Sequence, residues 1–130
     1  MVTIDTNIAV RLLVNDDPDQ TDRVAALFKA NQVFIAKTVA LETEWILRGV
    51  YKIDKEHINS ALTALFSLVN VQVEDSVALF AALSHHAQGM DFADALHLAS
   101  SQRADTFATF DAKMRTRAKE LQIKQEVVVP

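Results

Sequence analysis

Four acidic residues suit metal chemistry by their type and by their place in the sequence: Asp5, Glu42, Asp94 and Asp111. Two of them directly follow a short apolar run that resembles a β-strand, and the other two lie one turn into a predicted helix. In an open sheet flanked by helices, ligands bind beyond the carboxyl ends of the strands. We therefore expect the four carboxylates to converge at one edge of a sheet.

Carboxylates that converge within a few ångströms repel one another by about 4 kcal/mol per pair in a partly screened site. A divalent cation removes this conflict, and a set of oxygen ligands selects Mg²⁺ or Mn²⁺. Because Mg²⁺ is usually completed by substrate phosphates, the expected chemistry is hydrolysis of a phosphodiester by a metal-activated water. The hydroxyls of Thr6 and Thr109, which lie beside two of the acids, either orient that water or a phosphate or act only as strand-end and capping groups.

Capping of helices is the simpler explanation for several of these acids, because Asp is favoured at helix starts for that reason alone. It applies equally to Asp5, Asp91 and Asp111. The spacing of Asp91 and Asp94 is that of a capping box, which favours Asp91 as the cap and Asp94 as the inward-facing group.

Glu42 is harder to explain by capping. Its neighbour Glu44 has Arg48 four residues on, which predicts an ordinary exposed ion pair, whereas Trp45 and Ile46 lie three and four residues after Glu42. We therefore expect Glu44 to face water and Glu42 to share the apolar face of the helix. A carboxylate there requires either a raised pKa or a metal ion.

Short β-branched runs alternate with helical patterns along the chain, which predicts an α/β fold with a mainly parallel sheet covered by helices on both faces. The predicted strands are 2–4, 33–36, 69–73, 106–109 and 126–129. The predicted helices are 8–13, one that starts at Pro18 and continues through Phe28, 38–53, 54–68, 75–89, 91–102 and 112–121. A length of 130 residues favours one domain, residues 1–130.

Composition excludes several classes of protein. The chain has no Cys, which excludes disulfide scaffolds and thiol chemistry, and its 2 Gly residues cannot build a nucleotide-binding glycine loop. No apolar stretch approaches the length of a membrane span, so we expect no membrane association and a cytoplasmic location. The net charge of −4 means that any contact with nucleic acid must be local.

One basic cluster follows Asp111 and consists of Lys113, Arg115, Arg117 and Lys119. It is either a solvated helix face or a set of phosphate contacts, and Lys113 and Arg115 are the preferred candidates for RNA contact. His97, one turn from Asp94, is a further candidate for RNA contact or for support of the site. The four histidines have no zinc-type spacing with acidic partners.

The motifs around the four acids resemble those of the PIN-domain ribonucleases and, within them, the VapC toxins of bacterial toxin–antitoxin pairs. The matching segments stand in the same order as in that family and span almost the whole chain: Asp5-Thr6-Asn7, Val39-Ala40-Leu41-Glu42, Asp94-Ala95-Leu96 with Ala99, and Thr109-Phe110-Asp111. The last of them departs from the Thr-Asn-X-X-Asp-Phe pattern of many relatives.

The resemblance implies a PIN-like three-layer α/β/α domain with about five short strands in a twisted sheet. It implies that Asp5, Glu42, Asp94 and Asp111 bind the metal and catalyse the reaction, that Asn7 is a buried hydrogen-bonding support, and that Asp91 is an additional acid. It further implies an endoribonuclease that cuts structured RNA such as tRNA, forms a homodimer, and is inhibited by a cognate VapB-type antitoxin. Two other interpretations remain open: a non-catalytic protein-binding module whose acids only cap helices, and a metal-dependent DNA nuclease or phosphatase.

Overall fold

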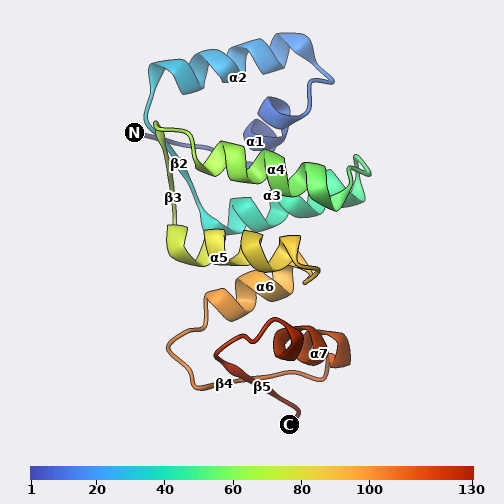
Figure 1. Ribbon diagram of the computed structural model, residues 1–130. Helices are drawn as coiled ribbons and strands as arrows, with labels where there is room; N and C mark the ends of the chain where they lie inside the picture. Colours follow the sequence, from blue (N-terminus) through green and yellow to red (C-terminus); the bar gives the residue numbers. More distant parts are fainter. The chain divides into compact units, whose positions relative to one another are not determined.

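The computed structural model describes residues 1–130 in two units, Met1–Ser76 and Val77–Pro130 (Figure 1). The first unit is built on a parallel sheet of three strands in the order β1-β2-β3. The strands are β1 (Val2–Thr3), β2 (Val33–Ile35) and β3 (Val71–Val73). The central strand is the most buried, because Val33 and Ile35 are fully shielded from water.

Four helices complete the first unit: α1 (Thr6–Leu13), α2 (Pro18–Ala30), α3 (Lys37–Gly49) and α4 (Lys55–Phe66). α1 packs against α2 and α3, α3 packs against α4, and α4 packs against β3. The predicted helix starts at residues 17 and 54 are confirmed, since Asp17 and Asp54 accept hydrogen bonds from backbone N–H groups of the first turns of α2 and α4. α3 ends at Gly49, earlier than the predicted residue 53, and the loop that follows contains Lys52 with a φ of 55°.

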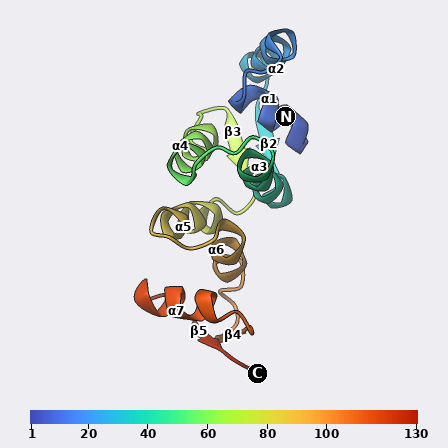
Figure 2. The ribbon, with the colours of Figure 1, turned by 90° about the vertical axis from the view of Figure 1, so that its right-hand side faces the viewer.

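The second unit holds α5 (Ser76–Ala87), whose first residue still belongs to the first unit, and α6 (Phe92–Ala99), followed by β4 (Thr106–Ala108), α7 (Ala112–Glu120) and β5 (Glu126–Val128). β4 and β5 pair in parallel, and α7 connects them. Figures 1 and 2 show α5 and α6 side by side, and His86 of α5 packs edge-on against Phe92 of α6 with ring centroids 5.6 Å apart. α7 packs against β5 and buries Met114 and Ala118.

The predicted α/β class and the parallel pairing of its strands are confirmed. All five strands lie within the predicted segments, divided into a three-stranded and a two-stranded sheet. The assignment of residues 1–130 to a single domain stays a prediction. None of the helices is long and apolar enough to cross a membrane.

Candidate functional site

The first unit contributes Asp5, which lies between β1 and α1. Its backbone is extended, with φ −92° and ψ 178°, and its Oδ1 accepts a hydrogen bond of 3.1 Å from the backbone N–H of Ile8. Asp5 is therefore the N-cap of α1, and this contact fixes the direction of its carboxylate. The second carboxylate oxygen accepts no hydrogen bond and remains available to a ligand.

Glu42 of α3 is held by Thr6, the first residue of α1. The hydroxyl of Thr6 is buried and donates a hydrogen bond to Oε1 of Glu42. This contact brings the Glu42 carboxylate to the first residue of α1, which directly follows Asp5 in the sequence. The sequence left two roles open for Thr6, one toward water or a phosphate and one as a strand-end or capping group. In the structure its hydroxyl contacts a candidate metal ligand, Glu42.

The expected orientation of α3 was wrong. Glu44, predicted to face water, is only 2% exposed and accepts a hydrogen bond of 2.9 Å from Nε of Arg48, whereas Glu42 is exposed and Trp45 is 57% exposed. The buried face of α3 consists of Ala40, Thr43, Glu44 and Leu47, at helical spacings of three and four residues. The candidacy of Glu42 therefore rests on its contact with Thr6 and not on burial in an apolar face.

Asn7 also differs from what the resemblance implied. It is the second residue of α1 and its side chain is exposed, so the structure does not give it the expected buried, hydrogen-bonding position. The buried residues of α1 are Thr6, Ala9 and Val10. The buried residue next to Asp5 is Thr6, and its hydroxyl donates a hydrogen bond to Glu42.

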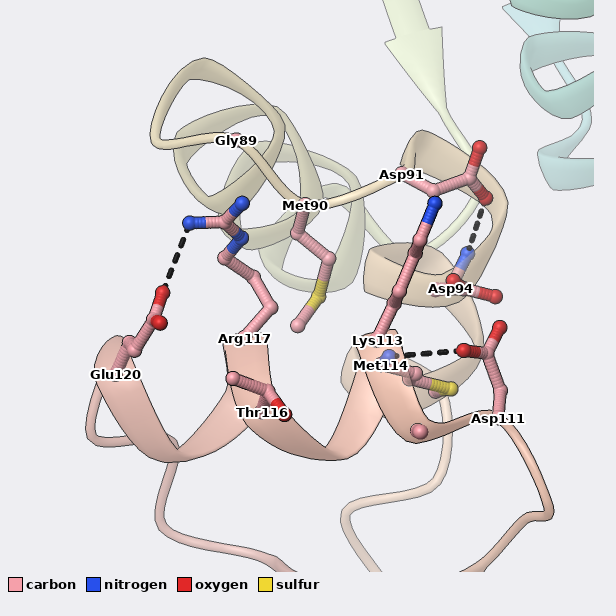
Figure 3. Close-up of a pocket in the computed structure, with 11 residues that line it drawn as sticks. Gly89, Met90, Asp91, Asp94, Asp111, Lys113, Met114, Thr116, Arg117 and Glu120 are labelled. Carbon is pink, nitrogen blue, oxygen red and sulfur yellow. Dashed lines mark hydrogen bonds and ion pairs between the residues drawn. The ribbon is translucent and has the colours of Figure 1, made fainter.

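The second unit contains a pocket of about 750 Å³ between the start of α6, the turn before it and one face of α7 (Figure 3). Three Asp side chains line it, and so do Glu120 and two basic side chains of α7. Its charged and turn residues are Gly89, Asp91, Asp94, Asp111, Lys113, Arg117 and Glu120.

Asp91 is the N-cap of α6, as predicted, because its Oδ2 accepts a hydrogen bond of 3.1 Å from the backbone N–H of Asp94. Asp94 lies in the first turn and is half-buried, with its side chain at the pocket (Figure 3). Asp111 caps α7 in the same way, accepting 3.0 Å from the N–H of Met114. The backbone N–H of Asp111 in turn donates to the hydroxyl of Thr109, which fixes the turn between β4 and α7.

The three carboxylates act on one another electrostatically. Burial raises the pKa of Asp94, and the negative charges of Asp91 and Asp111 raise it further, while nearby His97 acts in the opposite direction. Asp94 is thus a carboxyl group whose charged form is disfavoured by its surroundings. A cation bound in the pocket would relieve this conflict.

The basic residues of α7 divide between two faces. Lys113 and Arg117 line the pocket with the three acids. Arg115, expected beside Lys113 as an RNA contact, lines a different cavity together with Lys119 and Gln125. Arg117 belongs to the basic cluster of the sequence but was not among its preferred RNA contacts, although its spacing of four residues from Lys113 places both on one face of a helix.

Carboxylate oxygens are the candidate ligands in both units, and this donor chemistry fits Mg²⁺ or Mn²⁺. Asp5 and Glu42 belong to the first unit, and Asp94 and Asp111 belong to the second. The structure holds no group of three or more acidic or histidine side chains close enough to bind a metal ion.

Parallel strands joined by helices, with capping acids after strands and an acidic pocket on the second unit, define an α/β protein suited to divalent cations. The family model described as PIN domain matches residues 2–120, and the chain belongs to this family. PIN domains are typically metal-dependent nucleases: they bind nucleic acids and generally use divalent metal ions. No curated protein matches the chain.

Proposed function

We propose that this protein is an endoribonuclease toxin of the VapC type, in which Asp5, Glu42, Asp94 and Asp111 bind Mg²⁺ or Mn²⁺. The observation that carries the proposal is the pocket of the second unit, where burial and two neighbouring acids raise the pKa of Asp94. Such a site favours a cation and, through it, a phosphate. The PIN family supplies the class of reaction, a metal-dependent nuclease.

The bound ion would supply an activated water and would stabilise the leaving oxygen of the phosphodiester. The chain itself orients the ligands: Asp5 and Asp111 are fixed by the N–H groups that they cap, and Thr6 holds Glu42. Lys113, which lines the pocket, would contact a phosphate of the RNA backbone.

Capping and metal binding are compatible in this arrangement. Asp5, Asp91 and Asp111 each use one carboxylate oxygen for the N–H of a helix start. The other oxygen of each group accepts no hydrogen bond in the structure. A cap therefore preorganises the carboxylate for a ligand, since its rotamer is set before the ion arrives.

The same capping contacts favour a second candidate function, a protein-binding module in which the acids only stabilise helix starts. The two candidates differ in their response to metal. Ligands should raise the melting temperature on binding, whereas caps should leave it unchanged. A DNA nuclease or phosphatase would share the response to metal but would differ in substrate.

The proposed partners are an RNA such as tRNA, a second copy of the chain and a VapB-type antitoxin. Support for the antitoxin comes from an apolar groove of about 700 Å³ in the first unit, bordered by α2 and the turn before β3. Its lining includes Leu12, Phe28, Leu68 and Val69, and Val69 is almost fully exposed. Such a groove suits the apolar face of an amphipathic helix.

The proposal is tested by incubating the purified protein with total tRNA, single-stranded DNA or a phosphomonoester, each with Mn²⁺ and with EDTA. We expect the protein to cleave RNA but neither DNA nor the phosphomonoester, and to do so only when Mn²⁺ is present. Asp5→Asn should lose this cleavage. Asp105→Asn is the matched control, because Asp105 is exposed and lies outside the pocket. RNA cleavage that persists in Asp5→Asn would refute the assignment. In cells, expression should arrest growth unless the antitoxin is supplied.

A further inference from the structure

Arg117 has no role in the acidic ligand set, yet its side chain lies at the same pocket (Figure 3). It stands one helical turn after Lys113 on α7, so the two basic groups share one face of the helix. Three Asp side chains and Lys113 lie toward the starts of α6 and α7, whereas the ion-paired Arg117 and Glu120 lie toward Gly89 and the end of α7. The pocket therefore has a carboxylate-rich end and an end formed by Gly89 and this ion pair.

Two neighbours hold the Arg117 guanidinium in place. Its Nη1 forms an ion pair of 2.8 Å with Oε2 of Glu120, one turn further along α7. On the other side it lies against Gly89, which has a φ of +105°. A Cβ at Gly89 would lie 3.4 Å from Cζ of Arg117, an ordinary van der Waals distance, so the guanidinium packs closely against this turn.

The pairing with Glu120 is suited to exchange. Both side chains are about half exposed, and ion pairs of this kind contribute little to stability because water screens them. A guanidinium binds a phosphate through two parallel hydrogen bonds, which is a stronger and more specific contact. An RNA phosphate can therefore displace the Glu120 carboxylate without disturbing the fold.

We propose that Arg117 binds a backbone phosphate of the RNA at the Gly89 end of the pocket, and that Glu120 holds the guanidinium there until RNA displaces it. This inference rests on the proposed ribonuclease function, since the strand bound by Arg117 would be the one cut at the carboxylate-rich end. Lys113 and Arg117 are separated by about 6 Å along the helix axis. We infer that they contact different phosphates, so that α7 runs along the RNA backbone.

The test is the binding of a fluorescent ten-nucleotide single-stranded RNA, measured by anisotropy at several salt concentrations in EDTA, where no RNA is cut. Arg117→Ala should weaken binding by about tenfold, the loss of one charge-assisted contact. It should also reduce the salt dependence by about one phosphate contact. Lys119→Ala is the matched control, because it removes the same charge from α7 at a residue outside this pocket.

Glu120→Gln separates phosphate binding from a merely structural role of Arg117. It should tighten RNA binding by about two- to fivefold, because the phosphate no longer has to displace a carboxylate from the Arg117 guanidinium. In the Arg117→Ala background, Glu120→Gln should change the RNA affinity only through the general effect of altering one charge on α7. Lys119→Ala measures the size of that effect. Equal RNA affinities of Arg117→Ala and Lys119→Ala, or weaker binding by Glu120→Gln, would overturn the inference.

The outcomes also distinguish this inference from the proposed function. If the wild-type protein cuts RNA and Arg117→Ala matches Lys119→Ala in KM and kcat, the assignment of Arg117 fails alone. If the protein binds RNA through Arg117 but cuts none, the catalytic proposal fails and phosphate binding stands. Absence of RNA binding by the wild-type protein overturns both.

Discussion

Asp94→Asn should have opposite effects on stability with and without metal. The substitution keeps the shape of the side chain and removes one of the four acidic side chains that line the pocket. Since burial and the charges of Asp91 and Asp111 raise the pKa of Asp94 in the folded protein, its ionised form opposes folding at neutral pH. The neutral amide removes this penalty.

The magnitude is modest because water reaches the Asp94 side chain, which is only half-buried. After screening, we expect a gain of about 0.5–1 kcal/mol in the free energy of unfolding, or about 2–4 °C in the melting temperature without metal. The sign follows from the raised pKa, because protonation of Asp94 favours the folded state. The difference in the free energy of unfolding between Asp94→Asn and wild type should therefore shrink as the pH falls through the pKa of Asp94 in the folded protein.

With bound metal, the wild-type protein should be more stable to unfolding than Asp94→Asn. A ligand at one hundred times its dissociation constant stabilises the folded state by about 2.7 kcal/mol, and Asp94→Asn should lose most of this gain. Thermal melting followed by circular dichroism, in EDTA and in a Mn²⁺ series, measures both effects. Asp105→Asn, an exposed control in the same unit, should leave both melting temperatures unchanged. A variant that is less stable than wild type in EDTA, or that keeps the full Mn²⁺ shift, would refute the reasoning.

Three further effects follow from single contacts. Arg48→Met removes the cation that pairs with buried Glu44 and should lower the free energy of unfolding by about 1–3 kcal/mol in urea denaturation; an unchanged midpoint would show that Glu44 needs no cation. Gly89→Ala forces a side chain into a φ of +105° and should cost about 1–3 kcal/mol by the same assay, a result that full stability would contradict. The pKa of Asp54 is lowered, chiefly by a hydrogen bond from the backbone N–H of His57 and then by the His57 ring. Asp54 therefore stabilises the fold above its ordinary pKa of 3.8, and this contribution disappears as the pH falls through the lower pKa of the folded state. Asp54→Ala should flatten the acid limb of the stability profile, and a profile identical to that of the wild type would exclude this cap as its cause.

Local signals in the sequence were sufficient for most helix starts and strands. Asp17 followed by Pro18 specifies a helix start by itself, because a cap bonds only to the next three residues. Asp91 and Asp94 were assigned their cap and pocket positions for the same reason. Short β-branched runs placed the five strands, since period and residue type depend on the local chain alone.

Tertiary packing decided the features that the sequence could not. Spacing placed Glu42 and Glu44 on different sides of α3, but only the packing of α3 against α1 and α4 determines which side is buried. The contact between Thr6 and Glu42 joins residues 36 positions apart, and no local pattern encodes it. Likewise, the fold determines that the face of α7 with Arg117, and not the face with Arg115, borders the pocket.

The proposed function rests on the claim that carboxylates of both units serve one metal-dependent activity. Electron paramagnetic resonance of free Mn²⁺, read alongside RNA cleavage in the same samples, tests it most directly on the wild-type protein, Asp5→Asn, Asp111→Asn and the control Asp105→Asn. We expect wild type and control to bind Mn²⁺ and cut RNA, and both site variants, one from each unit, to lose affinity for Mn²⁺ and cleavage together. A site variant of either unit that binds Mn²⁺ and cuts RNA like the wild type would contradict the claim.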